Sequence, residues 1–209
     1  MLVAGLDEAG RGSFIGRVYS ACVILPEDFS EKVLKNKITI RDSKKMSAKK
    51  RVQAREFIEK NALAFSVQWA EKEEIEQTNI LRATMLSMHR CIDSLTTKPE
   101  KILVDGNYFI PYPSIPHECI EKGDDSMECI AAASILAKTY RDEYIAQLCT
   151  ENPILEEYAI HKNMGYGTKV HLEKIREKGS TLFHRRTFGI CKRILNDPKN
   201  DSKNSISEN

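Results

Sequence analysis

The sequence lacks several features that assign a protein to a class at first sight. No apolar run reaches the ~20 residues of a membrane-spanning helix, since stretches such as 129–137 are much shorter. Asp7 and Glu8 interrupt any signal-peptide core near the N-terminus. The six cysteines include no CxxC pair, which argues against a zinc ribbon and against a compact disulfide scaffold. We therefore expect a cytoplasmic protein with reduced thiols and no membrane partner.

Net charge also says little, because 32 basic residues nearly cancel 30 acidic ones. The two signs are unevenly distributed, however, since residues 162–193 contain nine Lys or Arg and only two Glu. Such a basic segment is typical of a surface that binds nucleic acid. The length of 209 residues suits one domain, which we place at residues 1–197 with a helical end at 152–197. Residues 198–209 are rich in Asn, Ser and Lys, and we expect a disordered tail there.

Periodicity predicts an α/β fold. Strand patterns occur at 2–6, 18–25, 65–69, 102–104 and 118–120. Helical composition or spacing occurs at 44–59, 79–95, 128–148, 168–178 and 188–195. In the 79–95 helix, one apolar stripe should face the core: Leu81, Met85, Met88, Ile92 and Leu95. This order predicts a mixed five-stranded sheet flanked by helices, followed by a helical C-terminal extension.

Carboxylates follow three of the expected strands: Asp7 and Glu8 the first, Asp105 the fourth, and Asp124 with Asp125 the fifth. Functional groups gather at strand ends in open α/β sheets, so we expect these acids to converge. Asp7 and Glu8 can share one site only where their strand ends, because consecutive strand residues point to opposite faces. Crowded carboxylates need a cation, and oxygen ligands without His or Cys suit Mg²⁺ or Mn²⁺, a pair of which supports phosphodiester hydrolysis. For any one acid alone, a helix cap or a solvent-facing position is the better interpretation.

Eight segments resemble, in order, the motifs of the ribonuclease HII family: DEAGRG at 7–12, DSKK at 42–45, NIL at 79–81, VDGN at 104–107, KGD at 122–124, AAASILAK at 131–138, GYGT at 165–168 and HRRTF at 184–188. The resemblance covers about residues 2–193. It implies a ribonuclease H-like fold and an endonuclease that uses two metal ions. The implied substrates are ribonucleotides embedded in duplex DNA and the RNA strand of RNA–DNA hybrids. Cleavage on the 5′ side of the ribonucleotide would leave 3′-hydroxyl and 5′-phosphate ends.

The same resemblance implies which acids act. The catalytic and metal-binding residues are expected to be Asp7, Glu8, Asp105 and Asp124, whereas Asp125 falls at a variable position. On the long helix, Asp142 either supports these acids from behind or forms an ion pair on the helix surface.

Substrate contacts are expected from three groups of residues. Gly10, Arg11 and Gly12 should approach the 2′-hydroxyl and a phosphate, because glycine lets the backbone come close to the sugar. Tyr166 is implied to pack on the deoxyribose that follows the ribonucleotide. The expected phosphate contacts are Lys44, Lys45, Ser134, Lys138, Arg185 and Arg186. The histidines at 161, 171 and 184 suit polar packing or phosphate contacts better than a zinc site.

The sequence departs from the family pattern at three places. Ser13 and Arg17 replace prolines, so we expect a more mobile loop and an additional contact from Arg17 to the nucleic-acid backbone. Asn163 and Met164 lengthen the segment before Tyr166.

Three other hypotheses stay open at this point. One is the sister family ribonuclease HIII, which Arg11 in the Gly-x-Gly triplet disfavours because that family usually has Lys there. The others are a non-catalytic module that binds duplexes and a two-metal nuclease for another DNA structure, such as a junction resolvase. We expect a monomer, and the sequence names no protein partner.

Overall fold

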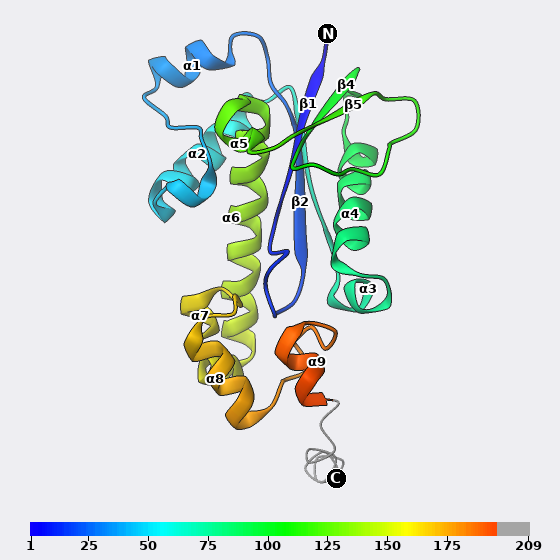
Figure 1. Ribbon diagram of the computed structural model, residues 1–209. Coiled ribbons are helices and arrows are strands. Elements are labelled where there is room, and N and C mark those ends of the chain that lie inside the picture. The colour runs from blue at the N-terminus through cyan, green and yellow to red at the C-terminus, as the bar shows by residue number, and fades with distance from the viewer. Residues whose placement is uncertain (196–209) are drawn as a thin grey trace.

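The structure is a computed structural model and describes residues 1–195. Its centre is a five-stranded sheet in the order β3-β2-β1-β4-β5 (Figure 1). The strands are β1 (Val3–Ala9), β2 (Val18–Ile24), β3 (Ala64–Ala70), β4 (Lys101–Asp105) and β5 (His117–Ile120). β2 pairs antiparallel with β1 and β3, whereas β4 is parallel to β1 and β5. The predicted mixed five-stranded sheet is confirmed, and the tail expected at 198–209 lies outside the described residues.

Two long helices cover the two faces of the sheet. α4 (Ile80–Ser94) packs on one face and α6 (Glu128–Glu151) on the other (Figure 1). The shorter elements are α1 (Phe29–Lys35), the 3₁₀ turn η1 (Ser43–Lys45), α2 (Ala48–Asn61), α3 (Lys72–Gln77), α5 (Gly123–Ser126), the 3₁₀ turn η2 (Pro153–Tyr158), α7 (Ile160–Asn163), α8 (Lys169–Lys178) and α9 (Gly189–Leu195). No helix within residues 1–195 has the length and apolarity needed to cross a membrane.

Two elements differ from their predicted limits. The helix expected at 44–59 is divided into η1 and α2, because Met46 is extended and the Ser47 hydroxyl caps α2 by accepting from the Lys50 N–H. β1 continues to Ala9 and does not stop before Asp7. The acids at its end therefore lie within a paired strand, where their side chains alternate between faces.

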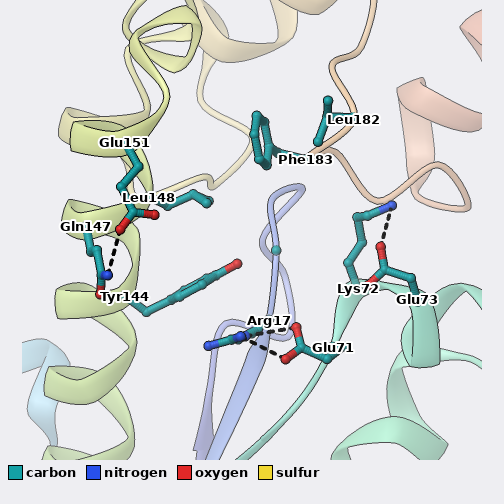
Figure 2. A pocket seen from close by; sticks show the side chains of 11 residues that line it. Arg17, Glu71, Lys72, Glu73, Tyr144, Gln147, Leu148, Glu151, Leu182 and Phe183 are labelled. Carbon is teal, nitrogen blue, oxygen red and sulfur yellow. Dashed lines mark hydrogen bonds and ion pairs between the residues drawn. The ribbon is translucent and has the colours of Figure 1, made fainter.

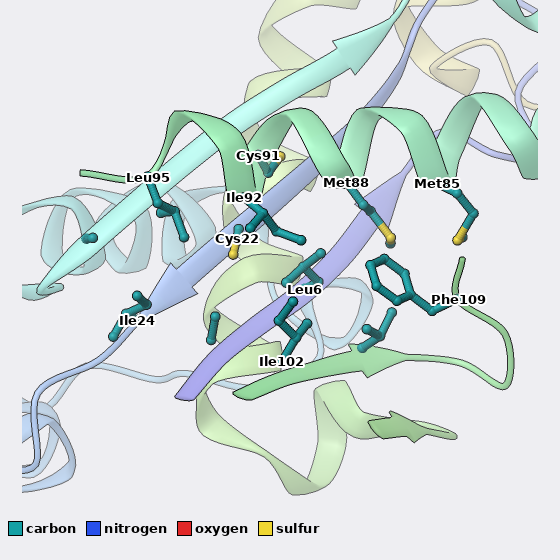
Figure 3. Packing of buried hydrophobic residues seen from close by; sticks show 13 residues of the cluster. Leu6, Cys22, Ile24, Met85, Met88, Cys91, Ile92, Leu95, Ile102 and Phe109 are labelled. Atoms are coloured by element: carbon teal, nitrogen blue, oxygen red, sulfur yellow. The ribbon is translucent and has the colours of Figure 1, made fainter. Parts of the chain in front are cut away.

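Figure 3 shows the core between α4 and the sheet. Met85, Met88, Ile92 and Leu95 are buried there, as the spacing predicted, and they pack over β1, β2 and β4. Leu81 was also expected in this stripe, but it is 37% exposed, because it lies in the first turn of the helix. The Met stripe is thus ordinary core packing.

The opposite face of β1 carries α6 at very short range. A Cβ atom added to Gly5 would lie 2.2 Å from the carbonyl carbon of Cys129, so only glycine allows this approach. Ala132 and Ala133 are fully buried in the same interface. The close approach brings the next residue of α6, Ser134, into hydrogen-bonding range of Asp7 in β1.

The C-terminal helices pack around the segment that follows β1. Ser13 forms a β-bridge with Tyr166, and Ile15 forms another with His184. Ser13 and Ile15 are fully buried, and Ile15 belongs to the apolar cluster of the C-terminal part. The structure gives no support to the more mobile loop expected at Ser13, since backbone bridges on two sides hold this segment.

Candidate active site

Three of the four expected acids lie at neighbouring points of the sheet, and the fourth lies in α5 beside β4. Because Leu6 of β1 pairs in register with Val104 of β4, Asp7 and Asp105 follow side by side. The N–H of Gly123 donates to an Asp105 carboxylate oxygen at 2.8 Å, and this bond brings Asp124 in the first turn of α5 close to β4. Parallel pairing and one hydrogen bond thus bring together acids from three distant parts of the chain.

Asp7 is the most deeply buried of the four, with 3% of its surface exposed. Burial raises the pKa of Asp7 well above its ordinary value, and the negative charges of Glu8 and Asp105 raise it further. The Glu8 N–H donates to Asp7 Oδ1 at 2.7 Å, and a hydrogen bond with Ser134 also favours the charged form. This electrostatic cost is what a divalent cation among the carboxylates would remove.

Glu8 lies next to Asp7, near the C-terminal end of β1. The ladder between β1 and β4 ends at Leu6, so no β4 residue pairs with β1 beside Glu8. Burial raises the pKa of Glu8, Arg11 at 3.1 Å opposes that shift, and the charge of Asp105 adds to it. The pairing with β4 therefore ends beside Asp7 and Glu8, whereas β1 itself continues to Ala9.

Asp124 completes the acidic cluster and is 6% exposed. Burial and then the charge of Asp105 raise the pKa of Asp124. Among residues 1–195, no three His, Cys, Asp or Glu side chains are already grouped as a metal cage. The four acids are electrostatic neighbours whose carboxylates can supply only oxygen ligands, the type that Mg²⁺ and Mn²⁺ prefer.

η1 presents its two lysines differently. Lys44 Nζ lies 3.8 Å from Asp124 Oδ2. Burial opposes the charge of Lys44, but its pKa is raised because Asp7, Asp124 and further acids attract the ammonium. Lys45 Nζ instead contacts both carboxylate oxygens of the exposed Asp125, at 2.6 and 2.7 Å. Lys44 thus faces the acids, whereas Lys45 and Asp125 form a pair on the surface.

Ser134 does not lie where a phosphate contact was expected. It is 3% exposed, and its hydroxyl is 2.9 Å from that of Ser43 and bonds to Asp7. Its role is corrected accordingly, because the hydroxyl ties η1 and Asp7 to α6.

Asp142 belongs to an ion-pair network and not to the acidic cluster. Lys138 Nζ contacts its Oδ1 at 2.7 Å, and Arg51 and Arg141 lie 3.7 and 4.0 Å from its carboxylate oxygens. Of the two alternatives weighed for Asp142, the structure supports the ion pair on the helix. The ion pair with Asp142 holds the Lys138 side chain beside a pocket next to Glu8.

A pocket of about 350 Å³ lies beside Glu8. Its lining consists of residues 8–12, Ser43, Lys44, Lys138 and Tyr166. Residues 10–12, here called the glycine loop, form one wall, and a Cβ added to Gly12 would lie 3.9 Å from the Tyr166 ring. Lys138 Nζ lies 5.7 Å from the centre of that ring. The pocket thus brings together the glycine loop, Tyr166 and two cations next to an acid of the cluster.

Comparison with known proteins decides the family. A model of the family "Ribonuclease HII" matches residues 4–191. The chain belongs to the ribonuclease HII family. It is 51% identical over 187 residues to ribonuclease HII of Parabacteroides distasonis, which covers 90% of this chain and 89% of that protein. With ribonuclease HII of Bacteroides thetaiotaomicron it shares 50% identity over 190 residues, which is 91% of this chain and 90% of that protein.

Solved structures agree with this assignment to the ribonuclease HII family. The ribonuclease H2 of Pyrococcus horikoshii matches with a TM-score of 0.74 and 25% identity, over 92% of this chain and 96% of that one. Bst-RNase HIII in complex with Mn²⁺ matches with a TM-score of 0.66 and 17% identity, over 93% of this chain and 69% of that one, a likeness of fold. The family resemblance and the ribonuclease H-like fold are confirmed, and the chain is an enzyme of the nuclease class.

Arg185 was expected to contact phosphate, and the structure gives this ribonuclease HII family member another arrangement. The side chain is fully buried, and its guanidinium donates to backbone carbonyls of the turn between β1 and β2, those of Gly10, Arg11, Ser13, Gly16 and Arg17. Burial lowers the pKa of Arg185 to about 9. The expected phosphate contact is wrong, because no surface of Arg185 is exposed; the residue holds the glycine loop from behind. Its neighbour Arg186 is exposed, as a phosphate contact requires.

Arg141 is a site residue that the sequence did not reveal. It is fully buried, and its Nη2 donates to Ser13 Oγ at 2.8 Å and to the Met164 carbonyl at 2.7 Å. Its guanidinium carbon lies 5.1 Å from the centre of the Tyr166 ring. Arg141 thereby joins α6 to the Tyr166 ring and to two residues just outside the pocket, Ser13 after the glycine loop and Met164 before Tyr166. The available signal was Ser13 itself, since the family proline has no side-chain acceptor for this bond.

Arg17 was expected to contact the nucleic-acid backbone, but it lies in a second pocket of about 370 Å³ (Figure 2). Its guanidinium bonds both carboxylate oxygens of Glu71, at 2.9 and 2.8 Å. It also stacks between the rings of Trp69 and Tyr144, at 4.8 and 4.7 Å. The expected backbone contact is therefore not supported, because these neighbours engage the side chain and tie the turn after β1 to β3 and α6.

Proposed function

We propose that this chain hydrolyses the phosphodiester on the 5′ side of ribonucleotides embedded in duplex DNA, and the RNA strand of RNA–DNA hybrids. The products are a 3′-hydroxyl and a 5′-phosphate. The observation that carries the proposal is the mutually repelling set of the buried Asp7 and the partly buried Glu8 and Asp105, directly beside the pocket of the glycine loop and Tyr166. The acids that would hold the metal ions then lie next to the pocket that would bind the ribose, because Glu8 lines that pocket.

Asp7, Glu8, Asp105 and Asp124 would hold two Mg²⁺ or Mn²⁺ ions. The donor set fits, because it offers carboxylate oxygens only. Burial first, and then the charges of neighbouring acids, raise the pKa values of Asp7, Glu8 and Asp124, and a bound cation would offset both effects. Bound ions supply an activated water and stabilise the leaving oxygen. The protein provides no side-chain nucleophile in this scheme, and its own task is to orient the phosphodiester.

Orientation falls to the pocket residues. The backbone of Gly10 and Gly12 approaches the ribose 2′-hydroxyl, the group that marks a ribonucleotide within DNA. Tyr166 packs on the following deoxyribose, so that an RNA-to-DNA junction fits best. Lys44, Lys138 and Arg186, together with the basic C-terminal segment, hold phosphates, which gives binding but no sequence preference.

The decisive experiment is a cleavage assay on duplexes that contain no ribonucleotide, one, or four, with Mg²⁺ and with Mn²⁺. We expect cleavage 5′ to the ribonucleotides and none of pure DNA. Asp124→Asn and Asp125→Asn form a matched pair of neighbouring acids, of which only the first should abolish cleavage, because Asp125 pairs with Lys45 on the surface. Equal cutting of pure DNA would instead favour a nuclease for another DNA structure, such as a junction resolvase.

A further inference from the structure

Two histidines form a buried pair in the C-terminal part of the chain. His171 lies in α8 and His184 just before α9, and neither is exposed. Their Nε2 atoms are 3.1 Å apart. The outer nitrogen of each ring meets the backbone, since the Thr181 N–H lies 2.9 Å from His184 Nδ1 and His171 Nδ1 lies 2.9 Å from the Tyr166 carbonyl oxygen. The two rings thus form a continuous hydrogen-bonded chain from Thr181 to Tyr166.

The backbone partners determine where the protons are. A backbone N–H can only donate, so His184 Nδ1 is the acceptor and its proton is on Nε2. A carbonyl can only accept, so His171 Nδ1 carries the proton and His171 Nε2 accepts from His184. Every nitrogen is satisfied when both rings are neutral. A second proton on His171 would face the proton on His184 Nε2. A second proton on His184 would break the bond from the Thr181 N–H and leave only the Thr181 hydroxyl, 2.8 Å from Nδ1, to accept it. Burial and the neighbouring ring agree with this state, because they lower the pKa of His184 to about 3.

The chain of bonds connects the two parts of the pocket that touch substrate in the proposed function. It ends at the Tyr166 carbonyl on one side. On the other side it includes His184, and the next residue, Arg185, holds the glycine loop through its guanidinium. The segment from Ser13 to Ile15 bridges Tyr166 and His184 on the other side. The imidazole pair therefore closes a ring of contacts that joins the tyrosine to the glycine loop.

We infer that the His171–His184 pair is a positioning device that sets the separation between Tyr166 and the glycine loop. The inference rests on the proposed function, in which these two elements read the deoxyribose and the ribose on either side of one junction. A fixed separation favours a single ribonucleotide followed by DNA over a continuous RNA strand, where Tyr166 meets another ribose. Loosening the pair lowers that preference without removing any group that touches the reacting phosphate.

Two substitutions at His184 separate this role from simple packing. His184→Asn retains an acceptor near the Nδ1 position for the Thr181 N–H but does not reach His171. His184→Gln carries an amide N–H to the Nε2 position and preserves the bond between the two side chains. We expect the ratio of kcat/KM for a single-ribonucleotide duplex to that for an RNA–DNA hybrid to fall about fivefold in the Asn variant, the size of one lost hydrogen bond. The Gln variant should retain the wild-type ratio.

A double-mutant cycle with Tyr166→Ala completes the test. Tyr166→Ala should lower the same ratio, and His184→Asn should then add nothing. An unchanged ratio in Tyr166→Ala would refute the role of Tyr166 in the proposed function. A lowered ratio in Tyr166→Ala with an undiminished further loss from His184→Asn would overturn the positioning role alone. Should the Asn variant fail to fold, ¹⁵N spectra of the wild-type imidazoles decide the matter: the inference requires the proton on Nδ1 of His171 and on Nε2 of His184, and the opposite pair of tautomers would refute it.

Discussion

The two halves of the site are held in different ways. The acids lie on or beside β1 and β4, where backbone pairing places them and where their charges oppose one another. The half that reads the substrate in the proposed function consists of loops, and buried side chains such as Arg185 and His184 hold them through hydrogen bonds to backbone groups. The acidic half, which is catalytic in the proposed function, thus costs stability unless a cation neutralises it, whereas the reading half contributes to the stability of the fold. The predictions below test that contrast.

Asp7→Asn should lower activity more than the substitutions that follow, but it should raise the stability of the metal-free protein. In the proposed function, the metal ions would supply several kcal/mol of transition-state stabilisation. Loss of one of their ligands should therefore lower kcat by about 10³-fold or more. The pKa of Asp7 is raised in the folded state, so the folded chain binds more protons than the unfolded one, and stability falls as pH rises through that window. Above it, the charged carboxylate destabilises the fold, and the metal-free Asn variant should melt at a higher temperature than the wild type.

Calorimetry without divalent ions, cleavage with Mg²⁺ and a duplex-binding assay check this prediction together. Binding should persist in the Asn variant, because the proposed phosphate contacts lie elsewhere. Retained Mg²⁺-dependent turnover would remove Asp7 from the mechanism, and a lower melting temperature would contradict the electrostatic contrast between the halves.

Arg185→Ala should show the reverse pattern, with the largest loss of stability. It removes a buried group that donates to five carbonyls in the turn between β1 and β2. Buried acceptors left without partners make a loss of about 3 kcal/mol in the free energy of unfolding the expected result. Arg186→Ala is the matched control, since that neighbour is exposed and its removal should change stability by less than about 0.5 kcal/mol. Equal stability of the two variants in urea unfolding would show that Arg185 does not hold the loop.

The sequence placed Asp7 and Asp105 near each other for a physical reason. Apolar runs followed by acids indicate strands, and parallel pairing aligns such strands. β1 continues past Asp7 to Ala9, but its register with β4 still brings Asp7 and Asp105 side by side. Helical spacing likewise identified the core face of α4, apart from Leu81 in its first turn.

The reading half was harder to predict, because burial of a polar side chain depends on segments that meet only in the fold. Arg185 and Arg186 look alike in the sequence, yet one is fully buried and the other exposed. Ser134, Arg141 and the histidine pair likewise have partners more than ten residues away along the chain. A local pattern of charges cannot distinguish a phosphate contact from a donor to distant carbonyls.

The dependence of stability on pH provides a third way to distinguish the acidic half of the site from the reading half. The unfolded chain takes up a proton on His184 below its ordinary pKa of 6.5, whereas the folded chain keeps the ring neutral until about pH 3. The unfolded state then binds more protons, so stability is lost as pH falls from about 6.5. The ring faces His171, Thr181 and the Tyr158 ring, and Arg185 follows it in the chain.

The acids of raised pKa act in the opposite direction, so the informative quantity is a difference between two proteins. We expect the melting temperature of the wild type to fall more steeply between pH 7 and pH 5 than that of His184→Asn, which has no imidazole at this position to protonate. Parallel melting curves over this range would show that the pair does not resist protonation.

Arg186→Ala should have the smallest effect, and one confined to binding. Loss of a single phosphate contact weakens a duplex about equally for all sequences and reduces the slope of log K against log salt by about one. Arg185→Lys serves as the comparison, because it keeps the charge but cannot supply the guanidinium's fork of donors to the turn. If Arg186 contacts phosphate and Arg185 does not, only the first variant changes the salt slope, while the second changes stability. A smaller salt slope in Arg185→Lys would mean that the buried arginine attracts the nucleic acid although no surface of it is exposed. The reading half would then have to include a charge that acts from inside the fold.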